Sequence, residues 1–240
     1  MNKEARILQT FVELADNLVE DFDVVELLTV LADRCVEVLG VDAAGIMLAA
    51  TDAPLRVIAS SSDAMRELEL FEIQAEEGPC LDCHRTGLRV SHPDLSSETP
   101  WPLFSREAVA AGYHVVNALP MRLRGATIGA LNLFDLTSPG LAADDLDIAQ
   151  TFADVATIAV LQDRAHVQAQ RLNDQLQGAL SSRVVIEQAK GMVAESRQVS
   201  IDVAFDELRG AARSASTKLS DFAAQVVDGR RRPGTFELTT

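Results

Sequence analysis

The sequence has few of the residues and motifs that catalytic sites need. Its four histidines are scattered, and the patterns GxxxxGK[ST], GxGxxG, HExxH and GxSxG do not occur. The acidic pair Asp144-Asp145 is better explained as the start of a helix than as a metal site. We therefore expect neither enzymatic activity nor a bound metal ion.

Long apolar runs and a cysteine framework are also lacking. No run of 18 or more apolar residues occurs, and the first residues lack the basic-then-apolar order of a signal peptide. Three cysteines, an odd number, indicate reduced thiols rather than disulfides. These absences predict a cytoplasmic protein without a membrane partner, and 48% hydrophobic residues in 240 predict one large or two small ordered domains.

The negative charge is unevenly distributed. Residues 1–169 hold 11 basic and 27 acidic residues, a net charge of −16, whereas residues 170–240 hold 10 and 9, a net charge of +1. A phosphate-binding site needs Lys or Arg, so any nucleic-acid site must be a local patch in the C-terminal part. We expect the acidic N-terminal part to repel a nucleic acid, or to cover that patch, until a signal arrives.

A helical pattern near the C-terminus carries a second pattern of basic residues. Its sequence is Ala179-Leu180-x-x-Arg183-x-x-Ile186-Glu187-x-Ala189-Lys190-Gly191-Met192. At 100° per residue, one apolar arc contains Val185, Ile186, Ala189, Met192 and Val193. Arg183, Lys190 and Arg197 recur every seven residues, which predicts an outward-facing cationic ridge along the border of that arc.

Two further amphipathic helices follow. Ser200 is a plausible N-cap for a helix that carries Phe205, Leu208, Arg209 and Arg213, and a third apolar stripe ends at Gly229, where a left-handed cap is expected. The three helices predict a small bundle with Phe205 and Phe222 supplying bulk at its centre.

The segment from about Leu172 to Gly229 resembles an ANTAR domain, the three-helix RNA-binding module of bacterial antitermination regulators. The resemblance implies a dimer that binds paired stem-loops in leader transcripts, with no DNA partner expected. The candidate RNA-binding residues are Arg183, Lys190, Arg197, Arg209, Arg213 and Lys218. The family often has an aromatic residue two positions after the Leu-Arg pair, where this chain has Ala211. By charge pattern alone, these cations could instead be a solvated face balanced by neighbouring acids.

The N-terminal two-thirds alternates helical and strand patterns. Two helices are expected over about 8–18 and 27–39, two strands over 44–50 and 55–60, and a short helix over 63–70. A loop-rich region with Pro79, Pro93, Pro100 and Pro102 follows, and then a hairpin over 117–136, which contains Pro120 and has its turn at Arg124-Gly125. A long helix begins near Ala143.

This order, with the motif Glu77-Gly78-Pro79-Cys80 and the strand Leu131-Asn132-Leu133-Phe134, resembles a GAF domain over roughly Leu8 to Ala165. The resemblance implies a sensor scaffold that binds an unidentified small molecule over its sheet, or that serves only as a dimerisation unit. The candidate ligand-pocket residues are Cys80, Trp101 and Phe104, although an aromatic there more often covers the core.

The segment Cys80-Leu81-Asp82-Cys83-His84 has the CxxCH spacing of c-type haem attachment. Such attachment normally occurs outside the cytoplasm, so haem is disfavoured here. Zinc binding or oxidation at Cys80, Cys83, His84 and His92 is a further, disfavoured alternative.

The predicted fold class is an α+β GAF-like sandwich with an antiparallel sheet and flanking helices, then a long connecting helix and an all-α three-helix bundle. We divide the chain into a sensor domain (1–165), a coiled-coil-like helical linker (166–178), an RNA-binding domain (179–229) and a flexible tail (230–240). The predicted function is a signal-responsive, homodimeric RNA-binding regulator that promotes antitermination. The alternative is a ligand- or redox-sensing module whose C-terminal bundle binds a protein partner.

Overall fold

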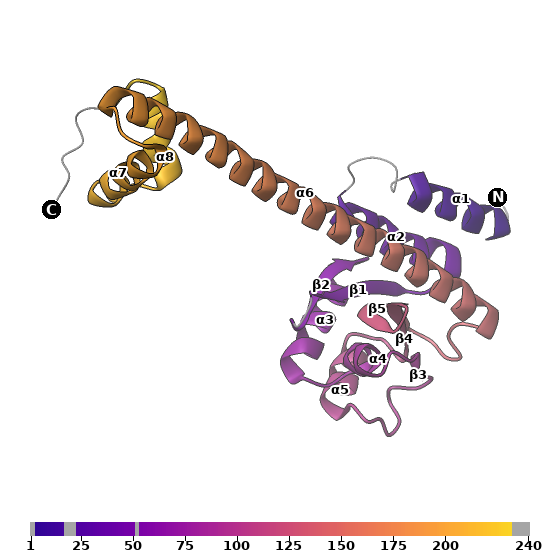
Figure 1. Cartoon of the computed structure of the whole chain (residues 1–240). Helices are drawn as coiled ribbons and strands as arrows, with labels where there is room; N and C mark the ends of the chain where they lie inside the picture. The colour runs from indigo at the N-terminus through magenta and orange to yellow at the C-terminus, as the bar shows by residue number, and fades with distance from the viewer. Residues whose placement is uncertain (1–2, 17–22, 51–52, 232–240) are drawn as a thin grey trace. The chain divides into compact units, whose positions relative to one another are not determined.

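The computed structural model describes residues 3–16, 23–50 and 53–231, and the chain divides into two compact units between Arg164 and Ala165. The first unit is a five-stranded sheet with helices on both faces, and the second is a bundle of three helical segments (Figure 1). One long helix contributes to both cores. This architecture confirms the predicted fold class.

The sheet is antiparallel throughout, with the strand order β2-β1-β5-β4-β3. Its strands are β1 (Ala43–Ala49), β2 (Leu55–Ser60), β3 (Val90–His92), β4 (Val115–Leu123) and β5 (Ala126–Asp135). The predicted hairpin is confirmed: β4 pairs with β5 across a turn in which Arg124 and Gly125 both have positive φ, as a two-residue hairpin turn requires. Every residue of β1 is buried, because helices cover both faces of the sheet.

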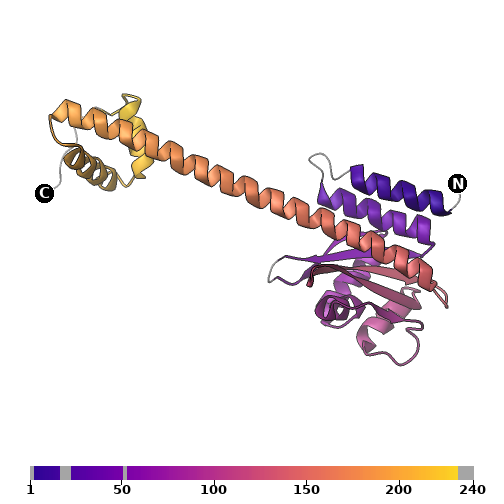
Figure 2. The ribbon, with the colours of Figure 1, turned by 45° about the vertical axis from the view of Figure 1, so that its right-hand side comes forward.

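One face of the sheet is covered by α2 (Val24–Leu39) and the first turns of α6 (Ala143–Arg197), and α1 (Lys3–Asp16) packs on the outer side of these two helices (Figure 2). Helix α2 begins at Asp23, whose carboxylate accepts the N–H of Val25, and ends at Gly40 in the left-handed conformation. Its apolar stripe packs on side chains from alternate strand positions. The largest fully buried residues of this core are Leu14, Leu27, Leu28, Leu31, Ile46, Leu119 and Phe152.

The opposite face is covered by α3 (Asp63–Ala75), α4 (Pro79–Thr86) and α5 (Pro102–Ala110) (Figure 1). The expectation of a loop-rich region here was wrong, because Pro79 and Pro102 each occupy the first position of a helix. A proline costs no hydrogen bond there, since the first N–H groups of a helix have no intrahelical acceptor.

The second unit is built from the end of α6, α7 (Ile201–Ser214) and α8 (Leu219–Val227). Its buried core consists of Ala189, Val193, Ala204, Leu208, Ala212, Phe222, Ala223 and Val226. The predicted N-cap at Ser200 is confirmed by its bond from the N–H of Val203, and Gly229 is left-handed as expected. Phe222 fills the centre, but Phe205 is only half-buried and is not part of the core, so that expectation was wrong.

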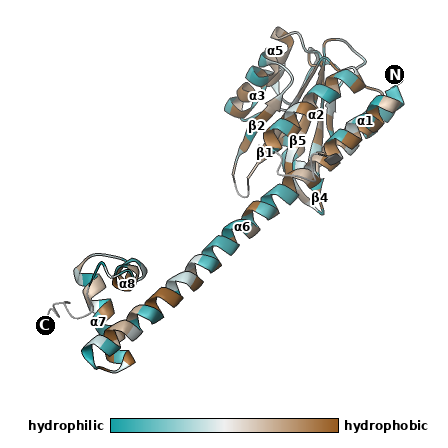
Figure 3. Cartoon of the chain, turned by 90° about the horizontal axis from the view of Figure 1, so that it is seen from above, coloured by the Kyte–Doolittle hydropathy of each residue, from teal (hydrophilic) through white to brown (hydrophobic). Residues whose placement is uncertain are grey.

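The middle of α6 is exposed on every side over residues 168–181. Apolar and polar colours alternate along it in Figure 3. Within the described ranges, no helix is long and apolar enough to cross a membrane.

The predicted flexible tail begins at residue 230, and residues 232–240 lie outside the described part of the chain. Arg231 is attached to the bundle: its Nε donates to Gln225 Oε1 at 2.7 Å, and its guanidinium lies 4.5 Å from the centre of the Phe222 ring. Arg231 is therefore a packing residue of α8 rather than a free cation.

Gly129 and Gly178 provide a matched test of this packing. A methyl group at Gly129 on β5 would overlap the main-chain oxygen of Met47 on β1, whereas one at Gly178 on α6 would meet open space. We expect Gly129→Ala to lower the free energy of unfolding by about 2–4 kcal/mol, and Gly178→Ala to raise helix stability by about 0.5–1 kcal/mol. Urea unfolding followed by Trp101, the single tryptophan, reports the first change, and far-UV circular dichroism reports the second. If Gly129→Ala leaves the urea midpoint measured by Trp101 fluorescence unchanged, β1 and β5 are not in close contact at Gly129.

Candidate functional site

The six predicted RNA-binding cations come from all three helical segments of the bundle. Helix α6 carries Arg183, Lys190 and Arg197, α7 carries Arg209 and Arg213, and Lys218 is the N-cap residue of α8. They differ in how much of their charge is already neutralised by the protein itself.

Lys190 and Arg209 lie next to the same aromatic ring. The Nζ of Lys190 lies 5.2 Å from the ring centre of Phe205, and the guanidinium of Arg209 lies 5.9 Å from it. Each cation also pairs with an acid three residues earlier in its helix, Lys190 with Glu187 at 2.8 Å and Arg209 with Asp206 at 3.0 Å. The half-buried ring is therefore contacted by cations from two different helices.

Lys190 and Arg197 do not form the outward-facing ridge that the heptad spacing predicts. Only 15% of the Lys190 side chain and 27% of the Arg197 side chain are exposed. Arg197 forms an ion pair with Glu207 on α7 at 3.2 Å, and its buried Nη1 has no hydrogen-bond partner among the described residues. The spacing located both residues on the border of the apolar arc, but α7 packs over that border and covers them.

Arg183, Arg213 and Lys218 are exposed. In the part of the chain that the structure describes, none of the three forms an ion pair. Ala211 is half-buried and packs on the bundle core. The most accessible positive charges of the candidate interface are therefore the three unpaired cations.

The three predicted ligand-pocket residues lie inside the first unit. Trp101 and Phe104 belong to one apolar cluster under α5, and Cys80 belongs to a second under α4. The indole N–H of Trp101 donates to Asp82 Oδ2 at 2.9 Å. All three side chains are buried, and their role in ligand binding stays a prediction.

The cysteines of the CxxCH segment face the core. Cys80 and Cys83 are fully buried, and burial raises the pKa of Cys83 to about 12 and that of Cys80 well above its ordinary value. A thiol with a raised pKa is a poor nucleophile and a poor metal ligand at neutral pH. The described residues contain no group of three or more His, Cys, Asp or Glu side chains placed to hold a metal ion.

The motif Glu77-Gly78-Pro79-Cys80 connects three helices through carboxylates at helix N-termini. Glu72 Oε1, on α3, accepts the backbone N–H groups of Cys80 at 2.7 Å and Leu81 at 3.1 Å, which lie in the first turn of α4. Glu77 Oε1 accepts the N–H of Phe104 at 3.0 Å in the first turn of α5. Each carboxyl oxygen accepts hydrogen bonds from donors that have no partner inside their own helix.

A row of small or polar residues crosses the sheet beneath α3 and α4. Ser60, Gly45, Asn132 and Ala118 pair directly from β2 to β4, and directly paired residues share one face of an antiparallel sheet. The carboxyl group of Glu69 occupies the space above Gly45, where a methyl group would overlap it. Its Oε2 accepts a hydrogen bond from Ser60 Oγ at 2.7 Å.

Four residues in and above this row, Ser60, Glu69, Glu72 and Asn132, make up what we call the polar seam. Glu69, Glu72 and Asn132 are buried, and within the described ranges Glu69 Oε1, Glu72 Oε2 and both amide atoms of Asn132 have no hydrogen-bond partner. Burial raises the pKa of Glu69 and that of Glu72 to about 8 each. Sequence reasoning missed the seam, although Glu69 and Glu72 follow Met65 at helical spacing on the apolar side of the helix.

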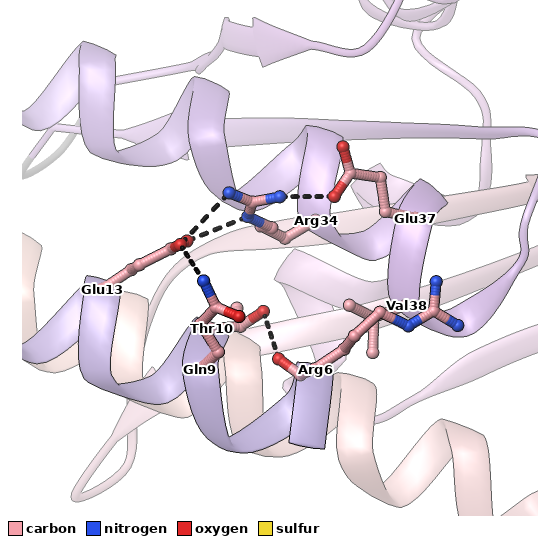
Figure 4. A pocket seen from close by; sticks show the side chains of 7 residues that line it. All are labelled: Arg6, Gln9, Thr10, Glu13, Arg34, Glu37 and Val38. Carbon is pink, nitrogen blue, oxygen red and sulfur yellow. Dashed lines mark hydrogen bonds and ion pairs between the residues drawn. The ribbon is translucent and has the colours of Figure 1, made fainter. Parts of the chain in front are cut away.

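A polar groove lies between α1 and α2 (Figure 4). It is lined by Arg6, Gln9, Thr10, Glu13, Arg34, Glu37 and Val38. Arg34 donates to Glu13 at 2.9 and 3.2 Å and is also bonded to Glu37, so its charge is satisfied within the protein. None of the predicted site residues lines this groove.

Comparison with known families assigns a domain family to each of the two units. The family model for the GAF domain matches residues 23–161, which is more than half of the chain, and the model for the ANTAR domain matches residues 174–227. These matches confirm the two resemblances in their predicted order. No curated protein matches the sequence.

Solved structures support the fold of the first unit. The GAF domain of a phosphoenolpyruvate-protein phosphotransferase from Coxiella burnetii is 16% identical, with a TM-score of 0.53, over 70% of this chain and 99% of that one. A second GAF domain structure is 14% identical, with a TM-score of 0.53, over 66% of this chain and 89% of that one. At these identities the similarity concerns the fold alone.

The raised pKa values of Glu69 and Glu72 predict that the first unit loses stability as pH rises. Both groups keep a proton up to about pH 8 when folded, but in the unfolded chain they release it near their ordinary value of 4.5. The folded state therefore binds more protons between these values, and we expect the free energy of unfolding to fall by about 2 kcal/mol or more from pH 5 to pH 8.

Urea unfolding followed by Trp101 fluorescence at pH 5, 7 and 9 measures this dependence. Glu69→Gln and Glu72→Gln should each flatten it, because a glutamine cannot release the proton. Glu67→Gln, at an exposed position of the same helix, should retain it. A wild-type stability that rises between pH 5 and pH 8 would show that the seam is not protonated.

Proposed function

Because the chain belongs to the GAF domain family and carries an ANTAR domain after its GAF domain, we propose that it is a signal-responsive RNA-binding regulator that binds paired stem-loops in leader transcripts and promotes transcription antitermination. ANTAR domains are RNA-binding antitermination modules, and GAF domains are signal-sensing domains. The observation that carries the proposal is the ANTAR match across all three helical segments of the bundle.

The charge of the bundle supports RNA as the partner. Arg183, Arg213 and Lys218 can each bind an RNA phosphate, because none of them forms an ion pair among the described residues. Phosphate contacts fix the position of a protein on the RNA, whereas RNA sequence is commonly recognised through splayed loop bases. Lys190 and Arg209 both lie beside the Phe205 ring, and an approaching phosphate would compete with Glu187 and Asp206 for them.

We propose that the first unit senses a small molecule, that the protein acts in the cytoplasm as a homodimer, and that it has no enzymatic activity. Helix α6 supports the dimer, because its exposed middle carries Leu172, Leu176 and Leu180 at helical spacing, with 56%, 61% and 70% of each residue exposed. Leucines exposed to this extent on one stripe are typical of a helix that pairs with a copy of itself.

The RNA proposal is tested by reversing one unpaired charge. We expect Arg213→Glu to weaken binding of a two-hairpin leader RNA at least about tenfold, and to lower the slope of log affinity against log salt by about one, because one phosphate contact is lost. A mobility-shift titration between about 50 and 200 mM salt measures both quantities.

Arg106→Glu is the matched control, since Arg106 is an exposed arginine on α5 in the other unit and its substitution makes the same change in net charge. It should bind RNA as the wild type does. If the wild-type protein fails to bind leader RNA but forms a salt-insensitive complex with a protein, the alternative of a protein-binding bundle replaces this proposal.

The dimer proposal is tested at the leucine stripe. Light scattering on the wild type should return twice the chain mass of 25.9 kDa, and Leu176→Glu should shift the protein toward the monomer, because a charge would be buried in the helix pair. Ser181→Glu introduces the same charge at an exposed position on a different side of α6 and should leave the dimer intact. A wild-type monomer at micromolar concentration would contradict the proposal.

A further inference from the structure

The polar seam contains more hydrogen-bonding atoms than the protein satisfies. Two carboxylate oxygens, Glu69 Oε1 and Glu72 Oε2, are buried, and neither they nor the amide of Asn132 has a partner within ordinary hydrogen-bond distance among the described residues. Each such atom is costly to bury, and natural cores keep few of them unless a ligand or water completes the site. Asn132 is fully buried on the sheet side, and a hydrogen-bonding interaction of its amide with the Glu69 carboxyl group and with the Cys80 thiol lowers the pKa of both.

When its glutamates ionise, the local charge of the seam is negative. Glu72 faces Glu69 on its own helix and Asp82 on α4, and both carboxylates raise its pKa further. The cations that act on this neighbourhood lie at its borders: Arg66 lowers the pKa of Glu69, and Arg122 lowers that of Cys83. Neither arginine forms an ion pair with a seam carboxylate in the described ranges. An anion would therefore be repelled here, and a cation attracted.

The chemistry of the unpaired atoms narrows the class of cation. When the two glutamates are ionised, the seam offers two carboxylate oxygens and one amide oxygen, which are acceptors for N–H donors. The described residues contain no group of three or more His, Cys, Asp or Glu side chains that could hold a metal ion. The donor set therefore fits a cation that carries its own hydrogen-bond donors better than a bare metal ion.

We propose that the polar seam is the binding site of a small organic cation with N–H donors, such as an ammonium or amidinium group, which Glu69, Glu72 and Asn132 bind directly. This inference deepens the proposed sensing role of the first unit by naming the charge class of its ligand. In the structure the two glutamates fill the space themselves: the carboxyl group of Glu69 lies over Gly45, and the side chain of Glu72 lies against Gly78. Burial raises the pKa of both, so they are protonated at neutral pH.

Binding of the cation would change the position of α4, because Glu72 accepts the first N–H groups of that helix. Glu72 is also the carboxylate that accepts the first N–H groups of α4, and Asp82 on that helix accepts the indole N–H of Trp101 at the start of α5. A cation that ionises Glu72 and draws its carboxylate toward the seam changes the contact that holds the N-terminus of α4. Trp101 fluorescence is therefore a natural reporter of occupancy.

The test uses the full chain and defined probes at constant ionic strength. Methylammonium and acetamidinium should raise the thermal midpoint of the first unit and change Trp101 fluorescence in a saturable way. Tetramethylammonium has no donors, potassium has no donors, and acetamide has no charge, so none of the three should do so. Glu69→Gln and Glu72→Gln should each weaken methylammonium binding at least about tenfold, because neither can become an anion. Glu67→Gln should bind as the wild type does.

Calorimetry in two buffers with different ionisation enthalpies supplies a second readout that needs no variant. At pH 7, methylammonium binding to the wild type should release protons, because the seam carboxyl groups ionise on binding. Equal effects of methylammonium and tetramethylammonium, binding without proton release, or full affinity in both glutamine variants would each overturn the inference. No RNA is present, so this outcome is independent of whether the bundle binds a leader transcript.

Discussion

Helix α6 packs into two separate cores, and both units depend on that packing. Its first turns place Phe152 and Ala156 against the sheet, and its last turns place Ala189 and Val193 against α7 and α8. The exposed stretch between them gains nothing from burial. An isolated helix in water is only marginally stable, so tertiary contacts at both ends fix the helix, and the middle continues it by adding one hydrogen bond per residue.

Most of the fold could be predicted from side-chain periodicity, because each helix that covers a core has a continuous apolar stripe. The helices over residues 79–110 could not be predicted in this way. A proline is common both in a turn and at the first position of a helix, and only the packing of α4 and α5 on the sheet shows that Pro79 and Pro102 begin helices. The prediction that Phe205 lies in the centre of the bundle was wrong for a related reason. An aromatic residue beside an apolar stripe can fill the core or hold cations, and Lys190, fifteen residues away in sequence, determines which.

The sequence predicted the bundle cations but not the polar seam. The cations of the bundle could be identified because heptad spacing and the Leu-Arg pair are local signals, but their exposure could not, because Glu207 and α7 cover Arg197. The polar seam depends on pairing between β1 and β5, residues far apart in the chain, so Asn132 and Gly45 gave no local signal. A polar residue on an apolar helix stripe, such as Glu72, is the sequence feature that should have indicated it.

The burial of all three cysteines has a practical consequence for observing this protein at work. Cys35, Cys80 and Cys83 are fully buried, and burial raises the pKa of each thiol. Thiol-directed dyes react with accessible thiolates, so the natural cysteines should stay unlabelled under native conditions. A single cysteine placed on the exposed middle of α6 would then carry one probe at a known position, which gives a direct optical view of how two copies approach each other in solution.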